Sequence, residues 1–128
     1  MQNFNIFFPM EPVAKARARV TALGNYTPKK TKDAEKLIAW SLRDKYKDKP
    51  HSGPVSVKME FYFRRPKARK KAVNHVCRPD LTNLAKTVED AANKILWDDD
   101  SQIISLQLDK YYVPYGQGGF IKMIVEFL

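Results

Sequence analysis

Hydrophobic and polar residues alternate in several segments of the chain, which is the pattern of half-buried β-strands. The clearest segment runs from Pro54 to Phe63, where apolar residues stand at every second position. We also expect strands at Phe4 to Phe8, which Pro9 ends, at Ile103 to Val113, and at Phe120 to Leu128. Gln117, Gly118 and Gly119 predict a hairpin connection between the last two strands.

Two other segments repeat apolar residues at helical spacing. The first begins at Thr31, a candidate cap with Glu35 in the first turn, and ends at about Tyr46. Its expected apolar stripe consists of Leu37, Ile38, Trp40, Leu42 and Tyr46. The second helix is expected from about Thr82 to Lys94, with a face of Leu84, Val88, Ala91 and Ile95.

The remaining segments predict connections. Lys15 to Lys30 and Arg64 to Arg78 are rich in cations, have no period and are predicted as basic loops, and Asp98 to Ser101 is a predicted turn. The order strand, helix, strand, helix, strand, strand predicts an α/β (α+β) fold. We expect a single domain over residues 1–128, a two-layer sandwich with two helices on one face of a mixed β-sheet.

Composition narrows the functional classes. The formal net charge is +9 over 128 residues, which favours a polyanionic partner, nucleic acid first and an acidic membrane surface second. No amphipathic helix with a continuous basic face stands out, and solubility alone is the alternative explanation of the charge. The lone Cys77 excludes an internal disulfide and a multi-cysteine zinc site. With no signal-peptide pattern and no long apolar run, we expect a cytoplasmic protein without a membrane segment.

Acidic residues gather in one part of this basic chain, at Asp80, Asp90 and Asp98 to Asp100. Carboxylates placed together repel one another unless a cation lies among them, and hard oxygen ligands suit Mg²⁺ or Mn²⁺. Such a metal would polarise a phosphate and orient a water molecule. Each residue also has a purely structural explanation, since aspartates are common in solvated turns and at helix caps.

Spacing predicts part of the geometry of this acidic group. Asn83, Lys86 and Asp90 lie three and four residues apart and should share one helix face. The helix should be roughly 20 Å long at about 1.5 Å per residue. Its two ends can meet at one site only if the following strand runs back alongside it. Otherwise Asp100 must reach the region of Asp80 from a neighbouring chain or a bent loop.

The stretch Arg78 to Ile103, RPDLTNLAKTVEDAANKILWDDDSQI, resembles the signature of the RusA-type Holliday-junction resolvases. The matching positions are Pro79, Asp80, Asn83, Lys86, Asp90, Ala91, Asp99, Asp100, Gln102 and Ile103. The resemblance implies a homodimeric crossover junction endodeoxyribonuclease that binds four-way DNA and cuts it with Mg²⁺, for which Mn²⁺ substitutes. It places Asp80 and Asp100 on catalytic, metal-associated aspartates, Lys86 on a catalytic lysine, and Asp90 and Asp99 on recurrent acids that we include in the metal set.

The chain departs from that signature at Thr82, where the family has a second aspartate. We therefore keep a catalytically weak or inactive junction-binding protein as the alternative, and a metal-binding or assembly protein without nucleic acid as a third reading. Phosphate contacts are expected from cations of the two basic loops. These are Lys15, Arg17, Arg19, Lys29, Lys30, Arg64, Arg65, Lys67, Arg69, Lys70 and Lys71.

Overall fold

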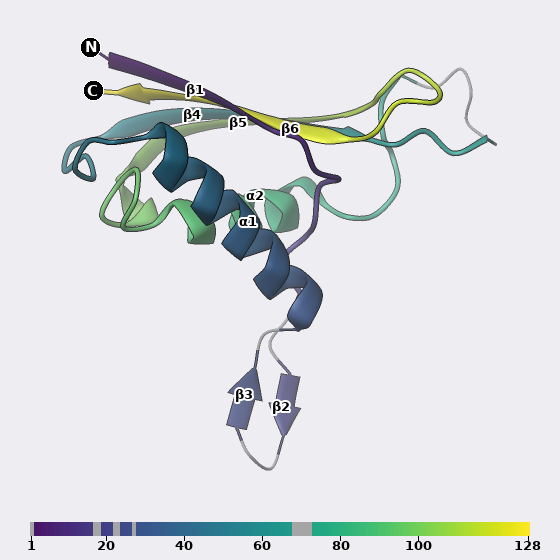
Figure 1. Ribbon diagram of the computed structural model, residues 1–128, viewed down its shortest axis with the longest axis horizontal. Coiled ribbons are helices and arrows are strands. Elements are labelled where there is room, and N and C mark those ends of the chain that lie inside the picture. Colours follow the sequence, from purple (N-terminus) through teal and green to yellow (C-terminus); the bar gives the residue numbers. More distant parts are fainter. Residues whose placement is uncertain (1, 17–18, 22–23, 27, 68–72) are drawn as a thin grey trace.

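One mixed sheet and two helices form the two layers of the molecule (Figure 1). The computed structural model describes residues 2–16, 19–21, 24–26, 28–67 and 73–128. The elements in chain order are β1 (Gln2–Phe8), β2 (Arg19–Thr21), β3 (Gly24–Tyr26), α1 (Lys29–Lys45), β4 (Val55–Phe63), α2 (Leu81–Ala92), the short 3₁₀ helix η2 (Asp100–Gln102), β5 (Ile103–Tyr112) and β6 (Phe120–Phe127). Both helices cover the same face of the sheet, so the predicted α+β class is confirmed.

The strand order is β1-β6-β4-β5, which corrects one prediction. β4 and β5 are parallel neighbours joined through α2, while β6 pairs antiparallel with both β1 and β4. A parallel pair needs a crossover helix, and the crossover through α2 places β5 on the outer side of β4. β5 and β6 are therefore separated by β4, and the predicted hairpin at Gln117 to Gly119 is wrong.

Gly119 has a different role from the predicted one. A Cβ at this position would lie 2.6 Å from the carbonyl oxygen of Tyr62. The Gly119 N–H donates to Glu11 Oε2 at 3.1 Å. The connection from β5 to β6 passes tightly over the end of β4 at this point, and only a residue without a side chain fits there.

The core lies between the sheet and the helices. Alternate residues of β4 and β6 are buried, as the two-residue period predicts. They pack with Ile38 and Leu42 of α1 and with Leu84 and Val88 of α2. This packing fixes the positions of α1 and α2 relative to each other, and with them the polar faces of the two helices.

The start and the buried stripe of α1 differ from expectation. The helix begins at Lys29 after Pro28, and Thr31 is buried instead of serving as the cap. The Thr31 hydroxyl donates to the Ala14 carbonyl and accepts from the Ala16 N–H, which ties the N-terminal segment to α1. The buried positions are Thr31, Ala34, Ile38 and Leu42, whereas Leu37 and Trp40, both predicted in the stripe, are 49% and 67% exposed. A 3.6-residue period centred on Ile38 turns Trp40 outward.

The segment from Lys15 to Lys30, predicted as a loop, contains the short antiparallel pair β2–β3. Gly24, with φ +113°, opens β3 in a conformation that favours glycine. In Figure 1 this pair projects beyond the start of α1. In the described residues, no helix has the length and apolar character needed to span a membrane.

Candidate active site

The helix α2 has an apolar face on the core and a polar face beside it. Leu84 and Val88 are fully buried, whereas Lys86 is exposed and Asp90 is half-buried. The Lys86 Nζ lies 3.1 Å from Asp90 Oδ1, one helical turn further along. The prediction that Lys86 and Asp90 share a helix face is confirmed.

The chain after α2 is anchored by Trp97. This side chain is fully buried, and its indole N–H donates to Asn93 Oδ1 at 2.7 Å. The Lys94 N–H donates to the Trp97 carbonyl at 2.7 Å, and Lys94 has φ 69°. This tight turn ends α2 at Ala92, earlier than predicted, and directs the chain back toward the helix.

Asp100 consequently reaches the middle of α2. Its Oδ2 lies 3.0 Å from Lys86 Nζ, a contact between residues 14 positions apart. The sequence left open how Asp100, which follows the helix, could reach residues on it. It does so because η2 and the start of β5 lie alongside α2. Asp100 thus lies beside Lys86, which also contacts Asp90.

Gln102 fixes the turn that carries Asp100. Its Oε1 accepts from the N–H groups of Asp98 and Asp99, at 2.8 and 2.9 Å. Its Nε2 donates to the carbonyls of His51 and Gly53, at 2.7 and 2.8 Å. Asp99 and Gln102 form a capping box, and the Asp99 carboxylate also accepts from the Ser101 N–H at 3.0 Å. The position of Asp100 is thus set by hydrogen bonds on both sides of it.

A chain of ion pairs extends from Asp100 to α1. Lys86 joins Asp100 to Asp90, and Lys15 joins Asp90 to Glu35 at 3.1 and 2.6 Å. Lys15 is held in place because its backbone N–H donates to the Asn83 carbonyl at 2.9 Å. The series Asp100–Lys86–Asp90–Lys15–Glu35, called here the charge relay, connects the N-terminal segment, both helices and η2.

Contacts within the charge relay shift the pKa values of both lysines. Hydrogen bonds to Asp100 and Asp90 raise the pKa of Lys86. Burial acts to lower the pKa of Lys15, but its hydrogen bonds to Glu35 and Asp90 outweigh burial, and the net shift is upward. Burial also raises the pKa of the neighbouring Glu89, and the negative charge of Asp100 adds to this rise. Both lysines stay charged at neutral pH.

The other predicted acids, Asp80 and Asp99, form no ion pair with Lys86 in the part of the chain that the structure describes. Asp80 stands before the first turn of α2, and its exposed carboxylate has no hydrogen bond or ion pair with any described residue. Six residues separate it from Lys86, about 9 Å along the helix axis. Asp99 uses its carboxylate on Ser101, and this contact lowers the pKa of Asp99. Thr82 is exposed on the first turn of α2.

Carboxylate oxygens are suitable ligands for a hard divalent cation, but few of them come together at this site. Among the described residues, no group of three or more His, Cys, Asp or Glu side chains is arranged to hold a metal. Asp90 and Asp100 nevertheless converge on one cationic position, which the Lys86 ammonium occupies. Mg²⁺ is commonly held by one or two carboxylates with water and phosphate oxygens. Two converging aspartates therefore fit that ion.

The predicted DNA-binding cations are placed in different ways. Lys15 belongs to the charge relay, Lys29 pairs with Asp33 at 2.7 Å, and Lys30, Arg64 and Lys67 are exposed. Arg65 donates to the Val113 carbonyl and lies over the ring of Tyr112. Arg17, Arg69, Lys70 and Lys71 lie outside the described residues, as does the side chain of Arg19, whose backbone belongs to β2.

Sequence reasoning missed two supports of this site. Glu35 was interpreted only as part of a helix cap, and Gln102 only as a match to a signature. Glu35 is twenty residues from Lys15, a spacing that no helical or strand period indicates. Gln102 is indicated only weakly, by its place three residues after Asp99, the spacing of a capping box.

The comparison with family models decides the classification. Residues 9–118 match the model of endodeoxyribonuclease RusA. The chain belongs to the RusA endodeoxyribonuclease family. The matched range includes Asp80, the whole of α2 and Asp100. A relative from Bacillus subtilis (strain 168), the uncharacterized protein YqaN, is 29% identical over 117 residues, which is 80% of this chain and 82% of its own length.

Family membership gives a coarse functional assignment. It supports an endodeoxyribonuclease that resolves Holliday junctions in DNA recombination. The charge relay lies inside the part of the chain that carries this assignment.

Proposed function

We propose that this chain is a structure-selective DNA endonuclease that resolves Holliday junctions by metal-dependent phosphodiester hydrolysis in recombination and repair. The observation that carries the proposal is the meeting of Asp100, Lys86 and Asp90 in a member of an endodeoxyribonuclease family. This group combines carboxylates that can hold a metal with an exposed cation that can meet a phosphate oxygen.

Lys86 is the proposed electrostatic catalyst. Its ammonium is oriented by two aspartates and is exposed enough to meet a phosphate oxygen. A fixed positive charge stabilises the negative charge that builds on the phosphate during hydrolysis. A divalent cation held by Asp90 and Asp100 would displace the Lys86 ammonium from the position between them, and the exposed ammonium would then be available to a phosphate oxygen.

Mg²⁺, or Mn²⁺ in its place, is the proposed cofactor. Asp90 and Asp100 are the first candidates to hold it, with Asp80 and Asp99 completing the proposed set. When bound, such an ion polarises the phosphate and lowers the pKa of a coordinated water. Asp80 supports the proposal because its carboxylate has no other partner among the described residues.

The proposed partner is branched DNA, bound by a homodimer. A four-way junction has near two-fold symmetry, and paired cuts need two active sites related by a two-fold axis. The net charge of +9 and the exposed cations Lys30, Arg64 and Lys67 support phosphate binding without sequence readout.

A gel assay with a labelled four-way junction and a matched linear duplex tests the proposal. We expect the junction to be bound and cut in the presence of Mg²⁺ or Mn²⁺, and bound without cutting when the metal is removed. Equal binding of both DNAs, or cutting that persists in a chelator, would contradict it.

A catalytically weak junction-binding protein remains the second candidate. Thr82 favours it, since this exposed position offers a hydroxyl where the resemblance expects a carboxylate. The test compares Thr82→Asp with the wild-type chain in Mn²⁺. An uncut junction with the wild-type chain and a cut junction with Thr82→Asp would establish this second candidate.

A further inference from the structure

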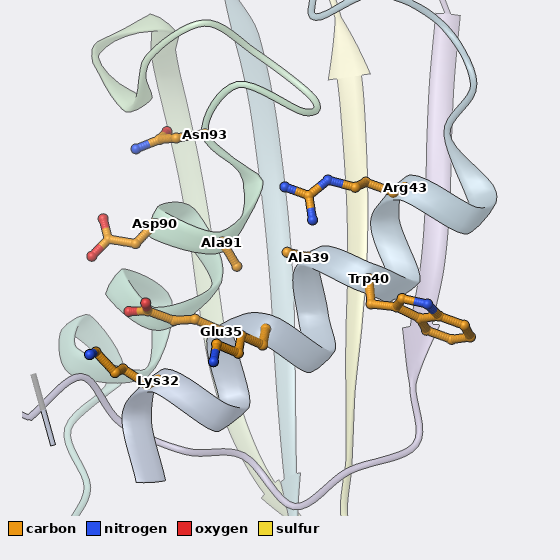
Figure 2. Close-up of a pocket in the computed structure, with 9 residues that line it drawn as sticks. Lys32, Glu35, Ala39, Trp40, Arg43, Asp90, Ala91 and Asn93 are labelled. Carbon is orange, nitrogen blue, oxygen red and sulfur yellow. The ribbon is translucent and has the colours of Figure 1, made fainter. Parts of the chain in front are cut away.

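A groove runs between α1 and α2 and has one wall on each helix (Figure 2). Its volume is about 500 Å³. The α1 wall carries Lys32, Lys36 and Arg43, and the α2 wall carries Asp90, Ala91 and Asn93. Figure 2 shows Arg43 pointing from α1 toward α2 and Lys32 on the same side. The groove therefore contains three cations of α1 together with Glu35 and Asp90 of the charge relay.

The cations of the α1 wall form a stripe at helical spacing. Lys32, Lys36 and Arg43 lie four and seven residues apart, and Lys29 extends the stripe by one turn. From Lys29 to Arg43 the stripe is about 21 Å long at about 1.5 Å per residue. That length equals about six base steps of a DNA strand at about 3.4 Å per step.

The charge of the groove is positive once its ion pairs are counted. Its two acids, Glu35 and Asp90, are both paired with Lys15, and Asp90 also with Lys86. Lys32, Lys36 and Arg43 form no ion pair with any other described residue. Three uncompensated cations on one wall attract a polyanion.

We infer that the groove between α1 and α2 holds the sugar–phosphate backbone of one DNA strand, with Lys32, Lys36 and Arg43 on its phosphates, and leads that strand to Lys86. The inference rests on the proposed binding of branched DNA. It adds a binding surface on α1 to the two basic segments on which that proposal depends.

A second copy of the chain is the competing occupant. Leu37 and Trp40 on α1 are 49% and 67% exposed and border this region. In a two-fold interface, however, the same surface lies on both sides of the axis, so the cationic stripes of the two copies would face each other. Such repulsion favours DNA over a second copy in the groove.

Two triple variants, each of which removes three positive charges, test the inference. The groove variant replaces Lys32, Lys36 and Arg43 with Gln. The control replaces Lys47, Lys49 and Lys122, which are exposed and lie outside the groove. Affinity for a labelled junction is measured over a range of salt. We expect the groove variant to bind at least ten times more weakly and to lower the slope of log affinity against log salt by about 2 to 3. The control should stay close to the wild-type chain.

Equal losses in the two variants, while the wild-type chain binds, would overturn the inference and leave the proposed function standing. A wild-type chain that binds no DNA would overturn both. Sedimentation of the Trp40→Ala variant tests whether a second copy of the chain, and not DNA, occupies the groove. A smaller mass for Trp40→Ala, together with full DNA affinity of the groove variant, would assign the groove to a second copy and also overturn the inference.

Discussion

At the scale of single residues, Lys86 is the group that links the acids of the site. It contacts Asp90 and Asp100 at 3.1 and 3.0 Å, and its removal leaves Asp90 paired with Lys15 alone and Asp100 without an ion pair to any described residue. The two contacts identify Lys86 as the residue whose loss should affect chemistry more than DNA binding.

We predict that Lys86→Gln lowers the rate of junction cleavage by about 100-fold or more, since a fixed charge on the reacting phosphate contributes on that order. Junction affinity should change less than threefold. Single-turnover cleavage and gel binding measure the two effects. The control is Lys45→Gln, an exposed lysine of the last turn of α1. A normal cleavage rate for Lys86→Gln would remove Lys86 from the mechanism.

Lys15 shows why residue roles are hard to predict from sequence. In the sequence it is one of several cations in a basic segment, and a phosphate contact is the natural interpretation. In the structure it is only 26% exposed and holds Glu35 and Asp90, which come from two different helices. A contact between residues far apart in the chain leaves no periodic signal, so this position of Lys15 was not predicted.

For Lys15→Met we expect the rate of cleavage at saturating protein to fall about tenfold, because Asp90 loses a partner and Lys86 its support. Lys15→Arg should restore most of the rate, since a guanidinium can also contact both acids. The measurement separates the rate at saturation from the dissociation constant. A weaker affinity with an unchanged saturated rate would instead show that Lys15 contacts phosphate.

At the scale of elements, the sequence predicted helices and central strands well and their connections poorly. β4 and α2 were predicted within a few residues because their apolar periods extend over several turns or pairs. The pair β2–β3 was missed because three residues are too few to show alternation. The neighbours of β5 were predicted wrongly because strand pairing is decided by the crossover through α2, which local sequence does not encode.

A variant that destabilises η2 tests whether this element holds Asp100 beside Lys86. Gln102→Ala removes four hydrogen bonds to backbone groups, two accepted from Asp98 and Asp99 and two donated to His51 and Gly53. We predict a loss of about 1–3 kcal/mol in the free energy of unfolding, measured by denaturant titration. Cleavage should fall as well, because Asp100 is no longer fixed beside Lys86.

Gln107→Ala is the matched control for Gln102→Ala. Gln107 is exposed on β5, and its amide contacts Asp109 at 3.3 Å. Its replacement should change the free energy of unfolding by less than about 0.5 kcal/mol. If the free energy of unfolding fell by the same amount in both variants, the hydrogen bonds of Gln102 would not be what stabilises η2.

At the scale of the whole molecule, the distribution of charge relates the fold to its proposed partner. The chain has 23 Lys and Arg residues against 14 Asp and Glu. Several of the acids are paired with lysines in the charge relay or along α1. Such pairing leaves Lys32, Lys36 and Arg43 to act as a positive surface. The sequence showed the excess of charge, but the surface appears only after folding decides which cations are paired.

This surface predicts a steep dependence of junction binding on salt. Each phosphate that a cation neutralises releases counterions, so the logarithm of affinity falls with the logarithm of salt by about 0.9 per contact. Three contacts per chain give about a 40-fold loss between about 50 and 200 mM salt. Gel binding over that range measures the slope. An affinity that changes less than about threefold would mean that phosphates contribute little, and the positive surface would then need another explanation, such as solubility.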